Sequence, residues 1–168
     1  DPTGHAHYGT RVALDGGVAI LASSNNNDAA YVYDVDRSSD TFGQLIRELV
    51  PTDTTSGGIG YSVDLKGILG AARDYGEVPG AGAAYIFDVR TGDQVAKVTA
   101  SDGASEDGFG LSVAISADAV IVGTLSDHPA GYHSGSAYLY HIPEPSAVLL
   151  IAIAVATIIG RRYAFRRP

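Results

Sequence analysis

Three carboxylates stand in loop segments whose composition suits a cation site. Asp74, Glu77 and Asp127 lie among glycines and small residues, and Asp74 and Asp127 each precede a tyrosine, Tyr85 or Tyr138, by 11 residues. Calcium takes about six to eight oxygen ligands, which loop carboxylates and carbonyls supply. These residues are therefore candidate ligands, with calcium as the candidate cofactor. The alternative is that they are turn residues capping backbone groups.

Other reaction chemistries have less support in the sequence. The run Asp34, Asp36 and Asp40 lies between two expected strands and favours a solvated hairpin. The chain has no cysteine, which excludes a thiolate nucleophile, and its five histidines show no zinc or nucleophile spacing. A pair of hydrolytic carboxylates stays open, because their separation is a property of the folded chain. We assign no catalytic residue and expect a protein that is not an enzyme.

The charge distribution excludes one class of partner. Residues 1–142 carry 18 acidic and 7 basic side chains, and the other four basic residues lie in the last eight positions. An acidic surface repels phosphate groups, so we do not expect nucleic-acid binding.

The elements that position these residues form a repeat. Three glycines that follow apolar or aromatic residues are separated by 51 and 50 residues: Gly9, Gly60 and Gly110. Three later tyrosines are separated by 54 and 53 residues: Tyr31, Tyr85 and Tyr138. A period near fifty residues that contains several short strands is typical of a propeller-type array.

Short alternating or β-branched runs predict four strands in each unit, which is the blade of a β-propeller. The unit boundaries fall at 1–52, 53–101 and 102–142, and the fourth strand of the third unit is missing. We therefore predict an all-β fold, a partial propeller of about three four-stranded blades with an incomplete last blade. We also expect further blades upstream in a longer precursor.

The third unit resembles an FG-GAP repeat, the blade of integrin-α-type propellers. The matching pieces are Phe109-Gly110, Ser112-Val113-Ala114, Ile121-Val122-Gly123 and Gly135-Ser136-Ala137-Tyr138-Leu139-Tyr140. The corresponding segments of the second unit are Ile59-Gly60-Tyr61-Ser62-Val63 and Gly82-Ala83-Ala84-Tyr85-Ile86-Phe87. The resemblance implies that cation sites lie between the second and third strands, although the alternating acids of an integrin-type calcium loop are absent.

The composition changes abruptly after Ile142. Pro143, Glu144 and Pro145 end the last strand, and residues 147–160 form an apolar run before Arg161 and Arg162. This pattern predicts a short transmembrane helix of about 20 Å. Each arginine would cost about 3 kcal/mol at the bilayer centre, so the arginines should stay cytoplasmic and the propeller outside.

Residues 143–168 resemble a PEP-CTERM sorting signal of Gram-negative bacteria, with its Pro-Glu-Pro motif, apolar helix and arginines in order. The resemblance implies an exosortase as processing partner and cleavage near Pro143, Glu144 and Pro145. One departure is that Tyr163, Ala164 and Phe165 split the arginines into two pairs. The alternative is a membrane anchor that is never cut.

These features predict a secreted or surface-displayed protein of the bacterial envelope. Its expected role is structural or adhesive, or the binding of extracellular polysaccharide or protein in a matrix. One alternative is a hydrolase or lyase of extracellular polysaccharide whose active site lies in missing blades. Another is a calcium-dependent binding module.

Overall fold

The computed structural model describes residues 9–23, 29–52, 59–67, 69–74, 82–104, 107–125, 135–142 and 161–163. All regular elements in these ranges are β-strands, as the all-β prediction expects. The strands are β1 (Arg11–Asp15), β2 (Val18–Ala22), β3 (Ala30–Asp34), β4 (Leu45–Leu49), β5 (Ile59–Lys66), β6 (Leu69–Asp74), β7 (Ala83–Asp88), β8 (Gln94–Val98), β9 (Ser112–Ile115), β10 (Ala119–Thr124), β11 (Ser136–His141) and β12 (Arg161–Tyr163).

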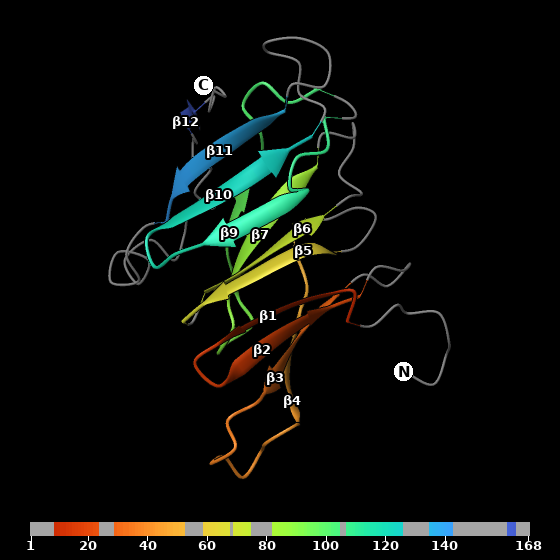
Figure 1. Ribbon diagram of the computed structural model, residues 1–168, viewed down its shortest axis with the longest axis vertical. Helices are drawn as coiled ribbons and strands as arrows, with labels where there is room; N and C mark the ends of the chain where they lie inside the picture. Colours follow the sequence, from red (N-terminus) through yellow and green to blue (C-terminus); the bar gives the residue numbers. More distant parts are fainter. Residues whose placement is uncertain are drawn as a thin grey trace.

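The strands form three antiparallel sheets of four, and neighbours in sequence are neighbours in each sheet. We call β1–β4 sheet 1, β5–β8 sheet 2 and β9–β12 sheet 3. Figure 1 shows the sheets one above another along the long axis, with sheet 1 and sheet 3 at the ends. Sheet 2 contacts both of the others, and the first strands β1, β5 and β9 follow one another through the stack. The described residues form this open series and no closed ring.

The local sequence explains the strands. The run Val18–Ala22 joins β1 through a tight turn at Gly16 and Gly17, whose φ angles are 56° and 82°. Those angles lie in the left-handed region, which glycine adopts without steric cost. β-Branched and aromatic residues are frequent in β3, β7 and β10, and β11 has two tyrosines; such residues suit a pleated surface that is covered on one or both sides.

Strand register confirms the repeat. The tyrosines Tyr31, Tyr85 and Tyr138 stand opposite Leu21, Ala72 and Val122, which occupy equivalent places in the second strand of each sheet. Leu14, Leu65 and Ile115 likewise stand opposite Ala19, Gly70 and Val120. Each sheet is therefore a copy of one unit.

Sheet 2 is buried on both faces. Its face with Leu65, Tyr85 and Phe87 packs on Ile20 and Val32 of sheet 1, and all five residues are 5% exposed or less. The opposite face contributes Ala84, Ile86, Ala96 and Val98 to a second core with Val120, Val122, Tyr138 and Tyr140 of sheet 3 and with Phe109 of the segment before β9. Two apolar interfaces of the same kind thus hold the series together.

Polar contacts also join the sheets along their first strands. The buried Ser62 hydroxyl donates to the Gly110 carbonyl oxygen at 2.7 Å. The carboxylate of Asp64 accepts the Ile115 backbone N–H at 2.8 Å, and that of Asp15 accepts the Gly67 N–H at 2.7 Å. These bonds satisfy backbone groups at the sheet junctions that would otherwise lose their hydrogen bonds to water.

The third unit, residues 102–142, contributes the three strands β9, β10 and β11. The fourth strand of sheet 3, β12, comes from the segment after Ile142 and pairs with β11 in the place that β4 and β8 hold in their sheets. The unpaired edge of β11 offers backbone donors and acceptors, and Arg161–Tyr163 returns in extended form to meet them. The predicted helix over residues 147–160 lies outside the described residues. In the part of the chain that is described, no helix long and apolar enough to cross a membrane is found.

Candidate functional site

The predicted calcium ligands are only partly placed. Asp74 is the last residue of β6, and its backbone stands opposite Ala83 of β7. Glu77 and Asp127 lie outside the described residues. Within the residues that are described, no group of three side chains with metal-binding atoms comes together. Calcium binding by Asp74, Glu77 and Asp127 stays a prediction.

The acidic run of sheet 1 closes a hairpin. Asp34 accepts hydrogen bonds from the hydroxyls of Ser39 and Thr41, both at 2.5 Å, and from the Asp36 N–H at 2.9 Å. These donors, with Ser39 the strongest, hold the pKa of Asp34 below its usual value. Asp36 in turn accepts two bonds from Ser38. These carboxylates order the turn between β3 and β4, as the hairpin interpretation of the sequence expects.

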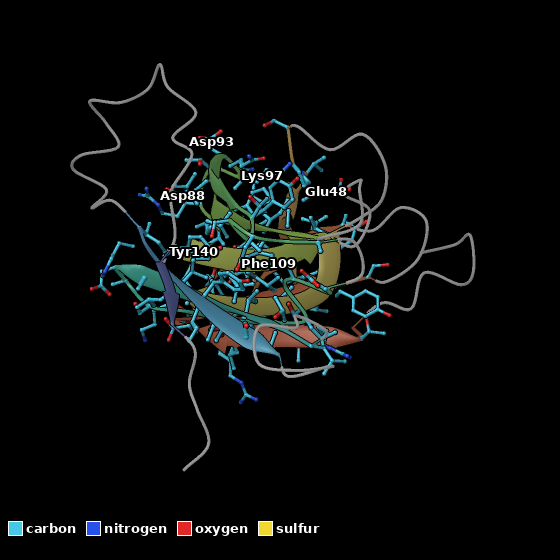
Figure 2. The ribbon with its side chains drawn as sticks, turned by 90° about the horizontal axis from the view of Figure 1, so that it is seen from above. Glu48, Asp88, Asp93, Lys97, Phe109 and Tyr140 are labelled. Carbon is cyan, nitrogen blue, oxygen red and sulfur yellow. The ribbon has the colours of Figure 1, made fainter. Side chains whose placement is uncertain are left out.

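Aromatic rings fill the interface between sheets 2 and 3. Phe109 packs edge-on against Tyr138 and Tyr140, with ring centroids 5.4 and 6.2 Å apart, and Figure 2 shows Phe109 beside Tyr140 in the interior. The hydroxyl of Tyr138 donates to Asp102 at 2.7 Å, and that of Tyr140 donates to the Thr99 carbonyl at 2.8 Å. Burial, and then the charge of Asp102, raise the pKa of Tyr140, so it stays neutral at physiological pH. Both tyrosines therefore anchor the linker between the two sheets.

A charged edge lies at the turn between β7 and β8. Figure 2 shows Asp88 and Asp93 at this edge. Lys97 lies further along β8, with its Nζ 5.3 Å from the centroid of the Tyr85 ring. Arg90 forms an ion pair with Asp88 at 2.9 Å. Partial burial opposes ionisation of Asp88, but the hydrogen bonds and charge of Arg90 outweigh it and lower the carboxyl pKa. Arg47 of sheet 1 also donates to the Arg90 carbonyl at 3.3 Å, so this edge links neighbouring sheets.

Sheet 1 exposes apolar side chains on the face that points away from sheet 2. We call it the open face of sheet 1, and it consists of Val12, Leu14, Tyr31, Tyr33 and Leu45. Val12, Leu14 and Leu45 are 65%, 71% and 50% exposed, and both tyrosines are partly exposed. An exposed apolar patch of this kind marks an interaction surface.

Sequence reasoning did not single out this surface. Alternation in β1 shows that Val12 and Leu14 share one side, but not whether another sheet covers that side. The repeat could have identified this surface, because it aligns Val12 and Leu14 with apolar positions that pack in the cores of the next two units.

The residues of the predicted sorting signal are also divided. Pro143, Glu144 and Pro145 lie outside the described residues. Arg161 and Arg162 belong to β12, where their backbones stand opposite Leu139 and Tyr138. The backbones of both arginines therefore pair with β11 and form part of the edge strand of sheet 3.

Comparison with known proteins supports the repeat and the fold. Residues 93–140 match the FG-GAP repeat, a span that runs from β8 through β11. Such repeats are typical of extracellular and surface domains. The crystal structure of the computationally designed Ika4 protein is similar, with a TM-score of 0.56 and 15% identity over 84% of this chain and 71% of that chain. At this identity the likeness concerns the fold alone. No curated protein matches the sequence.

Proposed function

We propose that this chain is a propeller-type repeat domain displayed on the envelope of a Gram-negative bacterium, where it binds extracellular matrix. Its partner would be an exopolysaccharide or a matrix protein. The observation that carries the proposal is the threefold repetition of one four-stranded sheet, with an FG-GAP repeat matched over β8 to β11. Repeat arrays of this type present broad, rigid surfaces, which suit binding to extended partners.

The use of the described carboxylates supports a structural and binding role. Asp15 and Asp64 accept backbone N–H groups of the neighbouring sheet, and Asp34 holds its own hairpin. A carboxylate that accepts a backbone N–H in this way replaces a hydrogen bond that the N–H group would otherwise make to water. These acids thus serve the architecture of the array.

Delivery to the envelope would depend on the C-terminal segment. We propose that residues 143–168 act as a PEP-CTERM signal, that residues 147–160 enter the membrane, and that an exosortase cuts near Pro143, Glu144 and Pro145. Membrane entry of residues 147–160 requires that β12 leaves its pairing with β11 in sheet 3, and cleavage removes β12 from the mature protein. The support is the order of motif, apolar run and arginines in the sequence. This part of the proposal has its own test and can fail without affecting matrix binding.

Matrix binding is tested by co-sedimentation of the purified chain with insoluble exopolysaccharide from a Gram-negative biofilm, with and without calcium. The expected result is retention of the chain without release of new reducing ends. Product release would favour the polysaccharide-degrading alternative. Retention only with calcium would favour the calcium-dependent module, and Asp127→Asn would then abolish retention. Absence of retention on both polysaccharide and matrix protein would refute the proposal.

Processing is tested by intact-mass spectrometry of the protein recovered from the cell surface of a strain that has an exosortase. We expect a mass that lacks residues 147–168, and the uncut mass in a strain without the enzyme. A matched variant, Glu144→Gln, should stay uncut in both strains. The full mass in both strains would instead indicate a membrane anchor that is never removed.

A further inference from the structure

The open face of sheet 1 has the residue pattern of a buried interface. Leu14 is 71% exposed, whereas its equivalents by strand register, Leu65 and Ile115, are 5% and 9% exposed. In sheets 2 and 3 the preceding sheet covers this position. Leu14 therefore occupies a core position of the repeat that no sheet of the described residues covers.

The aromatic residues of the third strands show the same difference in exposure between sheet 1 and the other two sheets. Tyr31 and Tyr33 of sheet 1 are partly exposed. Their equivalents, Tyr85 and Phe87 in sheet 2 and Tyr138 and Tyr140 in sheet 3, are all 1% exposed or less. The positions of Leu14, Tyr31 and Tyr33 on the open face of sheet 1 thus match positions that are buried against a neighbouring sheet of this same repeat.

The chain also carries the surface that would cover this face. In sheet 1, Ala30 and Val32 of β3 pack toward sheet 2, and their equivalents in sheet 2, Ala84 and Ile86, pack toward sheet 3. In sheet 3 the same positions are Ala137 and Leu139, which are partly exposed.

Two residues of the neighbouring strands complete that surface. Ile121 of β10 stands opposite Leu139 on one side and Ala114 of β9 on the other, and Ala114 is exposed. We call Ala114, Ile121, Ala137 and Leu139 the open face of sheet 3.

We propose that two copies of this chain associate head to tail, with the open face of sheet 3 of each copy covering the open face of sheet 1 of the other. The two open faces are different and complementary, so the contact is heterologous. Two copies contribute six sheets, which lies within the roughly four to eight blades of closed propellers. Closure would bury all four open faces, two from each copy, among the sheets that the structure describes. The proposal does not depend on what the array binds.

The residue sizes fit this arrangement. At the two interfaces within the chain, a face with large aromatic and leucine side chains meets a face of alanine and β-branched residues. Tyr31, Tyr33 and Leu14 supply the first kind of face, and Ala137 and Ile121 supply the second. Two copies of the aromatic face would instead place bulky rings against each other, which disfavours an isologous dimer through sheet 1.

The test is sedimentation velocity on the full chain at micromolar concentration. We expect a dimer of twice 17.3 kDa, and a monomer for Leu14→Glu and for Ala114→Glu. Both sites are exposed in the single chain, so neither variant should lose its fold, which circular dichroism checks. A carboxylate buried at the contact should weaken association by roughly a hundredfold or more. The control Phe42→Glu alters an exposed apolar residue outside the sheets and should leave the dimer intact.

Mixing the two monomeric variants makes the geometry testable. Each retains one intact face of a different kind, so an equimolar mixture should form an open heterodimer through one contact. An isologous dimer through sheet 1 would survive in Ala114→Glu alone and would overturn the proposal. A monomeric wild-type chain, or assemblies larger than two copies, would also overturn it.

Discussion

The most direct test of the repeat architecture compares two leucines at the same place in neighbouring sheets. Leu65 and Leu14 stand in β5 and β1 at equivalent register positions, but Leu65 is 5% exposed and Leu14 is 71% exposed. Leu65→Ala and Leu14→Ala remove the same atoms from the same strand position. Differences in intrinsic strand preference between leucine and alanine are therefore matched, and the comparison isolates the contribution of the neighbouring sheet.

The expected magnitudes follow from burial. Leu65 packs in the core between sheets 1 and 2, and a buried Leu→Ala change costs about 2–5 kcal/mol in transfer and cavity terms. In a domain of this size that corresponds to a fall of very roughly 5–20 °C in Tm. Leu14→Ala in the monomer removes a mostly exposed side chain and should change the free energy of unfolding by about 0.5 kcal/mol or less.

Urea unfolding followed by circular dichroism measures both variants, first at a protein concentration low enough to keep the chain monomeric. Equal costs for the two variants would refute the placement of Leu14 on an open face. Raising the protein concentration should then increase the cost of Leu14→Ala and leave that of Leu65→Ala nearly constant, because association stabilises the wild-type chain through Leu14. A cost for Leu14→Ala that does not depend on concentration would contradict the head-to-tail dimer.

Three further predictions probe the junctions. Ser62→Ala removes the buried bond to the Gly110 carbonyl and should cost about 1–3 kcal/mol in urea unfolding, while Ser62→Thr should recover part of it. Gly60→Ala should cost about 2 kcal/mol or more, because φ is 143° and a Cβ would lie 2.5 Å from the Ser23 carbonyl oxygen; a soluble variant of wild-type stability would refute this contact. The lowered pKa of Asp34 stabilises the fold above the unfolded pKa, near 3.9, and this contribution is lost as pH falls through the folded value. The stability difference between wild type and Asp34→Asn should therefore be present at pH 7 and shrink in strong acid, and a gap independent of pH would contradict it.

Local sequence was sufficient for most of the fold. The runs around Val18–Ala22 and Ala119–Thr124 are short, apolar and bounded by turns, which is the pattern of a covered strand. The nearly equal spacing of Tyr31, Tyr85 and Tyr138 then predicted equivalent positions, and the strand pairing confirms this. Periodicity works here because each sheet is built from adjacent segments.

The fourth strand of sheet 3 could not be predicted in the same way. β12 begins 20 residues after the end of β11, and its sequence, Arg-Arg-Tyr, has no strand periodicity of its own. It is a strand because the edge of β11 has backbone groups to pair, which is a property of the assembled sheet. The open face of sheet 1 could not be predicted from local sequence for a similar reason. The exposure of Leu14 depends on whether another sheet covers β1, and the alternation of residues in β1 carries no information about that.

The first strand illustrates why alternation alone misleads in an array of sheets. In β1 the residues Arg11, Ala13 and Asp15 alternate with Val12 and Leu14, and for an isolated sheet this pattern would place the valine and leucine inside. In the structure Ala13 packs toward sheet 2 and Asp15 bonds to Gly67, while Val12 and Leu14 point away. A sheet within such an array is covered on both faces, so the alternation of polar and apolar residues along a strand does not show which face meets the next sheet. In sheets 2 and 3 the side with large apolar residues meets the preceding sheet. Sheet 1 has large apolar residues on the same side although no sheet of the described residues covers them, which is the pattern of a face that another sheet covers.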